Sequence, residues 1–314
     1  MGEILSIIVA LSWTATAMFA EVASRRMGTL PLNVFRMLLS LVLLGITLLF
    51  LTGSALPMHA DCEVWGWLLL SGFVGYVFGD YCLFNSYLVI GSRFGQLFMT
   101  LAAPFAALAA WLFLGETLSW KALLGMTICL SGIGMSIMAR GTEEEADTPH
   151  KKRVRIKLPL RGVLLGIGAG AGQGIGLVLS KIGMTHYTCI IPATDVATIT
   201  AVPFASTMIR AVAGLIGFGG TMIALRRTHL LRSAFRDRRG VTAGIGAVIL
   251  GPFIGVSMSL MAVQMAPAGV AQTLMSLTPV FILLPSHLIF HTHVTRTEVV
   301  GAVVAVLGVS LFFV

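Results

Sequence analysis

The sequence predicts an all-α, polytopic membrane protein of ten transmembrane helices, arranged as two inverted five-helix repeats. Three observations predict this fold: an apolar composition, ten long apolar segments and a repeated proline motif. The 314 residues are 57% hydrophobic and 11% charged, with a mean hydropathy of +0.94. A soluble domain carries about 25% charged residues and could not enclose this much apolar surface. Lipid must therefore be the solvent for much of the chain.

Ten apolar stretches are long enough to cross a bilayer core of about 30 Å, which takes about 20 helical residues. They are continuously apolar and do not alternate between apolar and polar residues, which argues against transmembrane strands. The predicted spans are 4–24, 32–52, 65–89, 95–114, 121–139, 161–181, 204–225, 241–264, 269–290 and 297–313.

Basic residues concentrate in the odd-numbered loops between these spans. They include Arg25 after the first span, residues 151–161 after the fifth and residues 226–239 after the seventh, whereas the even loops hold little beyond Lys121 and Lys181. Cytoplasmic loops concentrate Lys and Arg, so both termini are predicted to lie outside the cytoplasm, with the chain in the cell (inner) membrane. The net charge of +8 then reflects topology and contact with membrane lipids, and nucleic-acid binding is not expected.

A polar segment divides the chain near its middle. Residues 141–160 contain three consecutive glutamates, Glu143–Glu145, followed by a basic cluster. This composition predicts a solvated linker. The first five-helix repeat would then cover residues 1–140, and the second would cover residues 161–314.

The two halves share a repeated motif. Gln96-Leu-Phe-Met-Thr-Leu-Ala-Ala-Pro104 in the first half matches Ala271-Gln-Thr-Leu-Met-Ser-Leu-Thr-Pro279 in the second. Further matched positions are Gly125 with Gly301, Gly132 with Gly308, and Arg36 with Arg210. Five is an odd number of helices, so the two copies would enter the membrane from opposite sides. Inverted repeats are common in carriers that work by alternating access, with the substrate site near the midplane at the repeat interface.

On these motifs the chain resembles the EamA-like family of the drug/metabolite transporter superfamily. The resemblance includes Leu114-Gly115-Glu116 after the first proline motif and the glycine-rich segment 125–134. It implies a proton- or exchange-driven transporter of amino acids, other metabolites or toxic compounds, often an exporter. The second copy departs from the pattern, because Ile289-Phe-His-Thr-His293 stands where Leu-Gly-Glu is expected. That loop therefore need not play the same structural part in both halves.

Asp80 is the leading candidate for binding a substrate charge or a coupling proton. Ionisable side chains within spans are costly and usually face a cavity or a partner. At 100° per residue, Tyr76, Asp80 and Tyr87 share one helical face. An acid between tyrosines could bind a cationic group or take up a proton. The alternative is a buried ion pair with a structural arginine such as Arg36 or Arg93.

Two arginines and several neutral polar side chains complete the candidate site. Arg36 and Arg210 could clamp a substrate carboxylate or pair with Asp80 or Glu21, and the alternative is snorkelling towards head groups. Cavity-lining candidates, each of which could instead serve packing or interhelical hydrogen bonds, are Trp13, Gln96, Gln173, Gln264 and Gln272. Hinge candidates, because proline interrupts helical hydrogen bonding, are Pro104, Pro252 and Pro279. The glycines of segment 166–176 are predicted to allow close helix packing.

No catalytic residues, cofactor or metal site are expected. His291 and His293 are most simply loop residues, and the cysteines lack metal-ligand spacing. The sequence contains no ATP-binding motif of the form GxxxxGK[ST], so transport driven directly by ATP is not expected. A disulfide between Cys62 and Cys189 and a homo-oligomeric state are left open. The other functions weighed are a membrane-embedded enzyme that acts on lipid-linked substrates and a passive channel or receptor-like scaffold. The favoured prediction is a secondary active transporter whose partner is a small-molecule solute.

Overall fold

The computed structural model describes residues 1–146, 159–281 and 296–311, and the regular structure in these ranges is helical. The first half contains α1 (Gly2–Met27), α2 (Thr29–Thr52), α3 (Cys62–Gly72), the π-helical segment η1 (Phe73–Asp80), α4 (Tyr81–Met99), α5 (Ala102–Leu114) and α6 (Trp120–Ala146). The second half contains α7 (Leu160–Ile190), α8 (Val196–Ala224), α9 (Thr228–Ala234), α10 (Arg238–Val248), the π-helical segment η2 (Ile249–Val256), α11 (Ser257–Met265), α12 (Ala268–Met275), α13 (Thr278–Phe281) and α15 (Arg296–Ser310).

Several of these helices are suited to a lipid environment. Within the described residues, six continuous helices are long and apolar enough to cross a membrane: Gly2–Met27, Thr29–Thr52, Cys62–Tyr87, Leu160–Ile190, Val196–Ala224 and Arg238–Met265. Their outward faces carry large apolar side chains, such as Phe50 and Ile216, which are 85% and 66% exposed. A surface with this much exposed apolar area is adapted to lipid. The prediction of a multi-pass membrane protein is therefore confirmed, whereas the number of ten spans stays a prediction.

The fourth and ninth predicted spans differ from expectation. A turn at Thr100–Leu101 separates α4 from α5, and a turn at Ser276–Leu277 separates α12 from α13. The ninth predicted span also continues into residues 282–290, outside the described ranges. The chain reverses direction within α4 (Tyr81–Met99), close to the loop expected between residues 89 and 95, because Gly162 of α7 lies against Ile90 whereas Gly166 and Gly170 lie against Phe98 and Leu101. An apolar segment contains no local signal for where such a helix breaks, and tertiary packing decides it.

The predicted linker is also shorter than expected. The helix α6 continues to Ala146 and α7 begins at Leu160, so the first residues assigned to the 141–160 linker are helical. Residues 147–158 lie outside the described ranges. The glutamates at the end of α6 extend the helix because glutamate has a high helix propensity. The division of the chain into two repeats at this linker remains a prediction.

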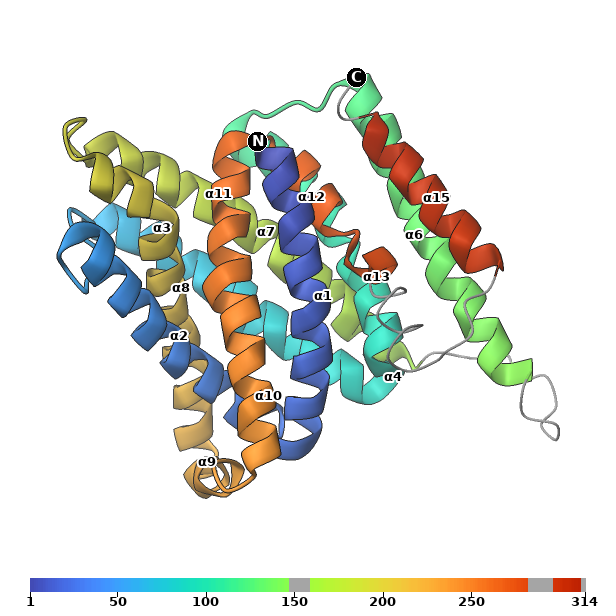
Figure 1. The fold of residues 1–314 in the computed structure, drawn as a ribbon, viewed down its shortest axis with the longest axis horizontal. Helices are drawn as coiled ribbons and strands as arrows, with labels where there is room; N and C mark the ends of the chain where they lie inside the picture. Colours follow the sequence, from blue (N-terminus) through green and yellow to red (C-terminus); the bar gives the residue numbers. More distant parts are fainter. Residues whose placement is uncertain (147–158, 282–295, 312–314) are drawn as a thin grey trace.

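Helices of each half pack against helices of the other half in a reciprocal pattern (Figure 1). The first helix of each half packs against the third helix of the other: α1 contacts α10, η2 and α11, and α7 contacts α3, η1 and α4. The helices α2 and α8 pack against each other, as do α6 and α15, which lie side by side at one flank of the molecule. Two similar units related by a two-fold axis would produce this arrangement.

Irregular backbone occurs at matched places in the two halves. Each π-helical segment has eight residues and follows a helix of 11 residues, α3 in one half and α10 in the other. The turns at Thr100–Leu101 and Ser276–Leu277 both lie within the repeated proline motif, shortly before Pro104 and Pro279. The motif found in the sequence thus corresponds to a shared backbone feature, a helix broken just before the proline.

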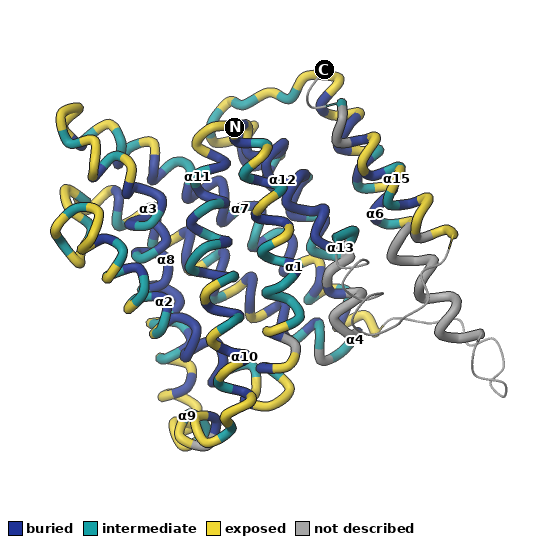
Figure 2. Tube along the Cα trace, viewed as in Figure 1, coloured by how far each residue is buried: buried dark blue, intermediate teal, exposed yellow. Residues whose placement is uncertain are grey.

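Glycines bring α7 into close contact with η1. A methyl group added at Gly172 would lie 2.8 Å from Cα of Gly79, and one added at Gly176 would lie 2.9 Å from Cα of Gly75. Both helices therefore carry a small-xxx-small pair on the facing side. Figure 2 shows α7 buried over much of its length. These short distances agree with the prediction that the glycines of segment 166–176 allow close helix packing.

The helix α9 and the start of α10 lie at the end of the molecule opposite the start of α1 (Figure 1). We call this the arginine-rich end, because residues 226–239 include Arg226, Arg227, Arg232, Arg236, Arg238 and Arg239. The helix α9 packs there against α1 and α2, and Arg26 forms an ion pair with Asp237 at 3.0 Å. The hydrogen bond from Arg26, together with that from the backbone N–H of Gly240, lowers the pKa of Asp237. The orientation of this end towards the cytoplasm stays a prediction.

Two further expectations from the sequence concern the cysteines and the placement of the two ends of the chain. Cys62 and Cys189 are free and exposed, so the structure contains no disulfide between them. The helix α1 begins and α15 ends at the same end of the molecule (Figure 1). An even number of spans, as predicted, would produce this placement.

Gly172→Ala tests the close packing of α7. Because the added methyl group would overlap backbone atoms of Gly79 and Val74, we expect a loss of about 1–3 kcal/mol of stability. Gly220→Ala is the matched control, since nothing lies within 4 Å of a Cβ there, and it should be neutral or slightly stabilising. Thermal unfolding of the purified variants in detergent measures both. Equal stability of the two variants would contradict the packing described.

Candidate functional site

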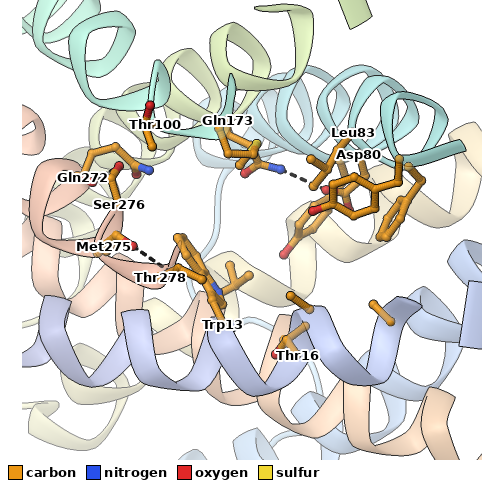
Figure 3. A pocket seen from close by; sticks show the side chains of 18 of the residues that line it. Trp13, Thr16, Asp80, Leu83, Thr100, Gln173, Gln272, Met275, Ser276 and Thr278 are labelled. Atoms are coloured by element: carbon orange, nitrogen blue, oxygen red, sulfur yellow. Dashed lines mark hydrogen bonds between the residues drawn. The ribbon is translucent and has the colours of Figure 1, made fainter. Parts of the chain in front are cut away.

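A cavity lies where the two halves meet, with about 830 Å³ of empty space including its opening to solvent. Figure 3 shows α1 on one side, with Trp13 and Thr16, and Gln173 of α7 on the opposite side. The lining residues of the first half are Trp13, Thr16, Ala17, Ala20, Arg36, Tyr76, Asp80, Leu83, Phe84, Tyr87, Met99 and Thr100. Those of the second half are Gln173, Gly251, Val256, Gln272, Met275, Ser276 and Thr278.

The cavity lies midway along the bundle, between two packed clusters. Along α1, Val9 belongs to a large core cluster, whereas Ala23 and Met27 belong to a second cluster with Phe35. Between them, Trp13, Thr16, Ala17 and Ala20 line the cavity. The cluster nearer the start of α1 is the larger, with 18 buried residues against seven. The cavity therefore lies between these two apolar clusters along α1.

Asp80 is the centre of a buried polar network. Its side chain is 6% exposed, and its Oδ2 lies 3.3 Å from Nη1 of Arg36, whose side chain is 8% exposed. Gln173 donates a hydrogen bond of 2.9 Å from Nε2 to Oδ1 of the same carboxylate. Arg36 also donates to Oδ1 of Asn33 at 2.8 Å. The network thus joins α2 and η1 of the first half to α7 of the second.

The two candidate arginines have different surroundings. Arg36 lines the cavity, and its guanidinium lies 5.1 Å from the ring centroid of Phe84. Arg210 is buried outside the cavity wall and lies over the ring of Tyr76, with Cζ 4.8 Å from the ring centroid. Attraction between a guanidinium and an aromatic face compensates part of the cost of burying each cation. Their matched sequence positions therefore do not correspond to matched roles.

The π-helical segments expose backbone carbonyls that side chains of the other half satisfy. Ser12 of α1 donates to the carbonyl oxygen of Leu250 at 2.7 Å. Gln173 of α7 donates to that of Gly75 at 3.2 Å and also reaches Asp80. Neighbouring polar side chains commonly re-satisfy interrupted helices in membranes. Irregular helix, buried charge and cavity therefore coincide in η1.

The structure brings together most of the residues chosen from the sequence. Trp13, Gln173 and Gln272 line the cavity beside Tyr76 and Asp80. Two other candidates do not line it: Gln264 is exposed on α11, and Arg210 is buried outside the wall. The side chain of Gln96 lies outside what the structure describes.

The three candidate hinge prolines occupy different local positions. Pro104 lies in the first turn of α5, just after the break at Thr100–Leu101, where its missing N–H removes no intrahelical hydrogen bond. Pro252 lies inside η2, where an interrupted bond accompanies the π-helical backbone. Pro279 is the second residue of α13, and its side chain is not described. Their role as hinges stays a prediction.

Sequence reasoning missed several wall residues. Thr16, Ala17 and Ala20 follow Trp13 on one helical face of α1, a stripe that period-3.6 spacing could have revealed. Met99 and Met275 each stand directly before one of the two helix breaks within the repeated motif. The pairing of these positions was the available signal.

A polar contact ties the halves together beside the large cluster. Lys181 of α7 forms an ion pair of 2.5 Å with Glu116, in the connection after α5, and donates to the carbonyl oxygen of Ala266 at 3.0 Å. Glu116 also accepts from the backbone N–H of Ala268 at 3.0 Å. The glutamate of the Leu-Gly-Glu motif therefore holds the start of α12, which carries Gln272 into the cavity.

The described residues contain no group of three or more His, Cys, Asp or Glu side chains placed to hold a metal ion. His291 and His293 lie outside the described ranges. The arrangement at the cavity is suited to reversible binding of a solute, since it combines one buried acid, one cavity-lining guanidinium and neutral donors and acceptors.

Comparison with known proteins agrees with this architecture. The profile of the EamA-like transporter family matches residues 1–138 and 160–314. A solved structure described as "Crystal structure of protein" superposes with a TM-score of 0.65 at 14% identity, covering 99% of this chain and 95% of that chain. This likeness shows the fold alone. No curated protein matches the chain.

A double-mutant cycle on Glu116 and Lys181 tests the contact between the halves. Because both side chains are largely buried, Glu116→Gln or Lys181→Met alone should cost about 1–3 kcal/mol. The double variant should lose less than the sum, since neither group is then left unpaired. Unfolding of the purified protein in detergent gives the coupling. The exposed Arg26–Asp237 pair is the control and should show little coupling; equal coupling in both pairs would contradict the assignment.

Proposed function

Because this chain belongs to the EamA-like transporter family, we propose that it is a secondary active transporter that carries a small metabolite by alternating access. The solute would bind in the cavity between the halves. The observation that carries this proposal is that the cavity is lined by both halves and contains a buried charged network. The location in the inner membrane, both termini outside the cytoplasm and export as the direction are proposed with it.

The reciprocal packing of the halves supports alternating access. In carriers built from inverted repeats, the halves rock against each other around a site near the midplane. Here the broken helices α4–α5 and α12–α13 flank the cavity at matched positions. The larger apolar cluster seals the end where α1 begins. We propose that the solute enters from the arginine-rich end and that rocking of the halves transfers this seal to the opposite end.

Asp80 is the proposed proton-coupling residue. Its charge is held by Arg36 and Gln173, so a change of protonation alters the contact between α2, η1 and α7. A carboxylate whose protonation changes the packing between the two halves can couple proton movement to rocking. Val256 is the last residue of η2, as Asp80 is the last residue of η1, so the second half has no acid at this point.

Counterflow in proteoliposomes tests the proposal. Vesicles loaded with a mixture of unlabelled amino acids and other metabolites should accumulate the labelled form of the transported solute, with saturation. Trp13→Ala should lower the initial rate about tenfold or more, because an aromatic contact to the solute is lost. Asp80→Asn should retain exchange but lose drive by a pH gradient.

Trp111→Ala is the matched control, since Trp111 is 57% exposed on α5 and does not line the cavity. It should transport as the wild type does. Solute flux without saturation or counterflow would indicate a channel. Failure of correctly folded protein to move any solute would overturn the transporter proposal.

A further inference from the structure

Positive charge exceeds negative charge in the buried centre of this protein. Among the described residues, the buried charged side chains are Arg36, Arg210 and Asp80, which are 6%, 3% and 4% exposed. Two cations and one anion leave an excess of one positive charge. A buried charge without a counter-charge is unfavourable in a low-dielectric environment. The excess therefore favours a negatively charged occupant of the adjacent cavity.

Arg36 retains hydrogen-bonding capacity for such an occupant. Its Nη1 serves both Asn33 and Asp80, while its buried Nε has no protein partner. A guanidinium offers five N–H groups in a planar fork that matches the two oxygens of a carboxylate. Because Arg36 lines the cavity, an oxyanion could bind those of its N–H groups that Asn33 and Asp80 do not use, while Asp80 stays paired.

Arg210 contributes charge without contact. Its guanidinium packs over Tyr76 and is not on the cavity wall, and its Nε has no protein partner. Tyr76 separates this guanidinium from the cavity, and the charge of Arg210 therefore raises the positive electrostatic potential in the cavity without touching a bound solute. Removing this charge would weaken anion binding without altering any wall residue.

The rest of the wall fits an apolar body. Trp13, Leu83, Phe84 and Tyr87 face the cavity from α1 and α4. Their aromatic and aliphatic surfaces favour a ring or a branched chain. One guanidinium at the side and an apolar interior accommodate a molecule with one charged end.

We propose that the transported solute is a small organic monoanion, whose oxyanion binds Arg36 and whose apolar body packs against Trp13 and its neighbours. This inference rests on the proposed transport function and specifies its substrate class. Binding of one negative charge brings the buried cluster to neutrality. A neutral or cationic analogue of the same shape leaves the cluster positive and binds more weakly.

Three probes with the same ring test the proposal: phenylacetate, phenylacetamide and phenethylamine, which carry one negative charge, no charge and one positive charge. Calorimetric titration of the purified full-length chain at pH 7, with empty micelles as the blank, gives each affinity. Phenylacetate should bind about ten- to a hundredfold more tightly than the amide. Arg36→Gln should abolish this preference, and Arg36→Lys should keep it with lower affinity.

Two further variants separate charge from contact. Arg210→Gln should reduce the preference for phenylacetate although it alters no wall residue, and Asp80→Asn should tighten phenylacetate binding because it removes the competing negative charge. A gain of affinity cannot result from misfolding. Arg26→Gln, at the exposed pair with Asp237, is the control and should leave all affinities unchanged.

Equal affinities for the three probes, no binding of any of them, or preference for phenethylamine would overturn the anion proposal. Counterflow of a neutral or cationic solute would then leave the transporter proposal intact. The two proposals therefore fail separately.

Discussion

The ion pair between Arg36 and Asp80 is the interaction on which the rest of the structure depends. Both side chains are buried within apolar helices, where an unpaired charge is costly. The pair persists because Gln173 and Asn33 complete its hydrogen bonds and Phe84 covers the guanidinium. These partners come from both halves of the chain. The close approach of α7 to η1, which glycines permit, is therefore a condition for satisfying the charge.

The repeat supplies the frame, and differences between its copies supply the chemistry. Matched helix breaks and matched π-helical segments place two similar backbones around one cavity. Asp80, the last residue of η1, has no acidic counterpart in the second half, where Val256 is the last residue of η2. Arg210, the counterpart of Arg36, lies outside the cavity wall. A nearly symmetric scaffold thus carries one asymmetric charged site, which suits a carrier whose halves move alike but which binds a single solute.

Local pattern predicted the residue types of the site but not the partners that position them. Helical periodicity placed Tyr76, Asp80 and Tyr87 on one face, and all three line the cavity. Pairing with Arg36 was one of two alternatives, because sequence spacing does not reveal which distant helix is adjacent. The turn at Ser276–Leu277 interrupts an apolar segment that shows no break in composition. The same holds for Gln264, because the sequence does not determine which face of its helix lies against the cavity. In the structure this side chain is exposed on α11.

The coupling energy between Arg36 and Asp80 tests the central claim most directly. Arg36→Met, Asp80→Leu and the double variant would be unfolded in mixed micelles with increasing sodium dodecyl sulfate. Each single variant leaves one buried charge unpaired and should lose about 3–5 kcal/mol of stability. The double variant should recover more than half of the summed loss, because both charges are gone. Additive losses would contradict the account, since they would mean that the two side chains are stabilised independently of each other.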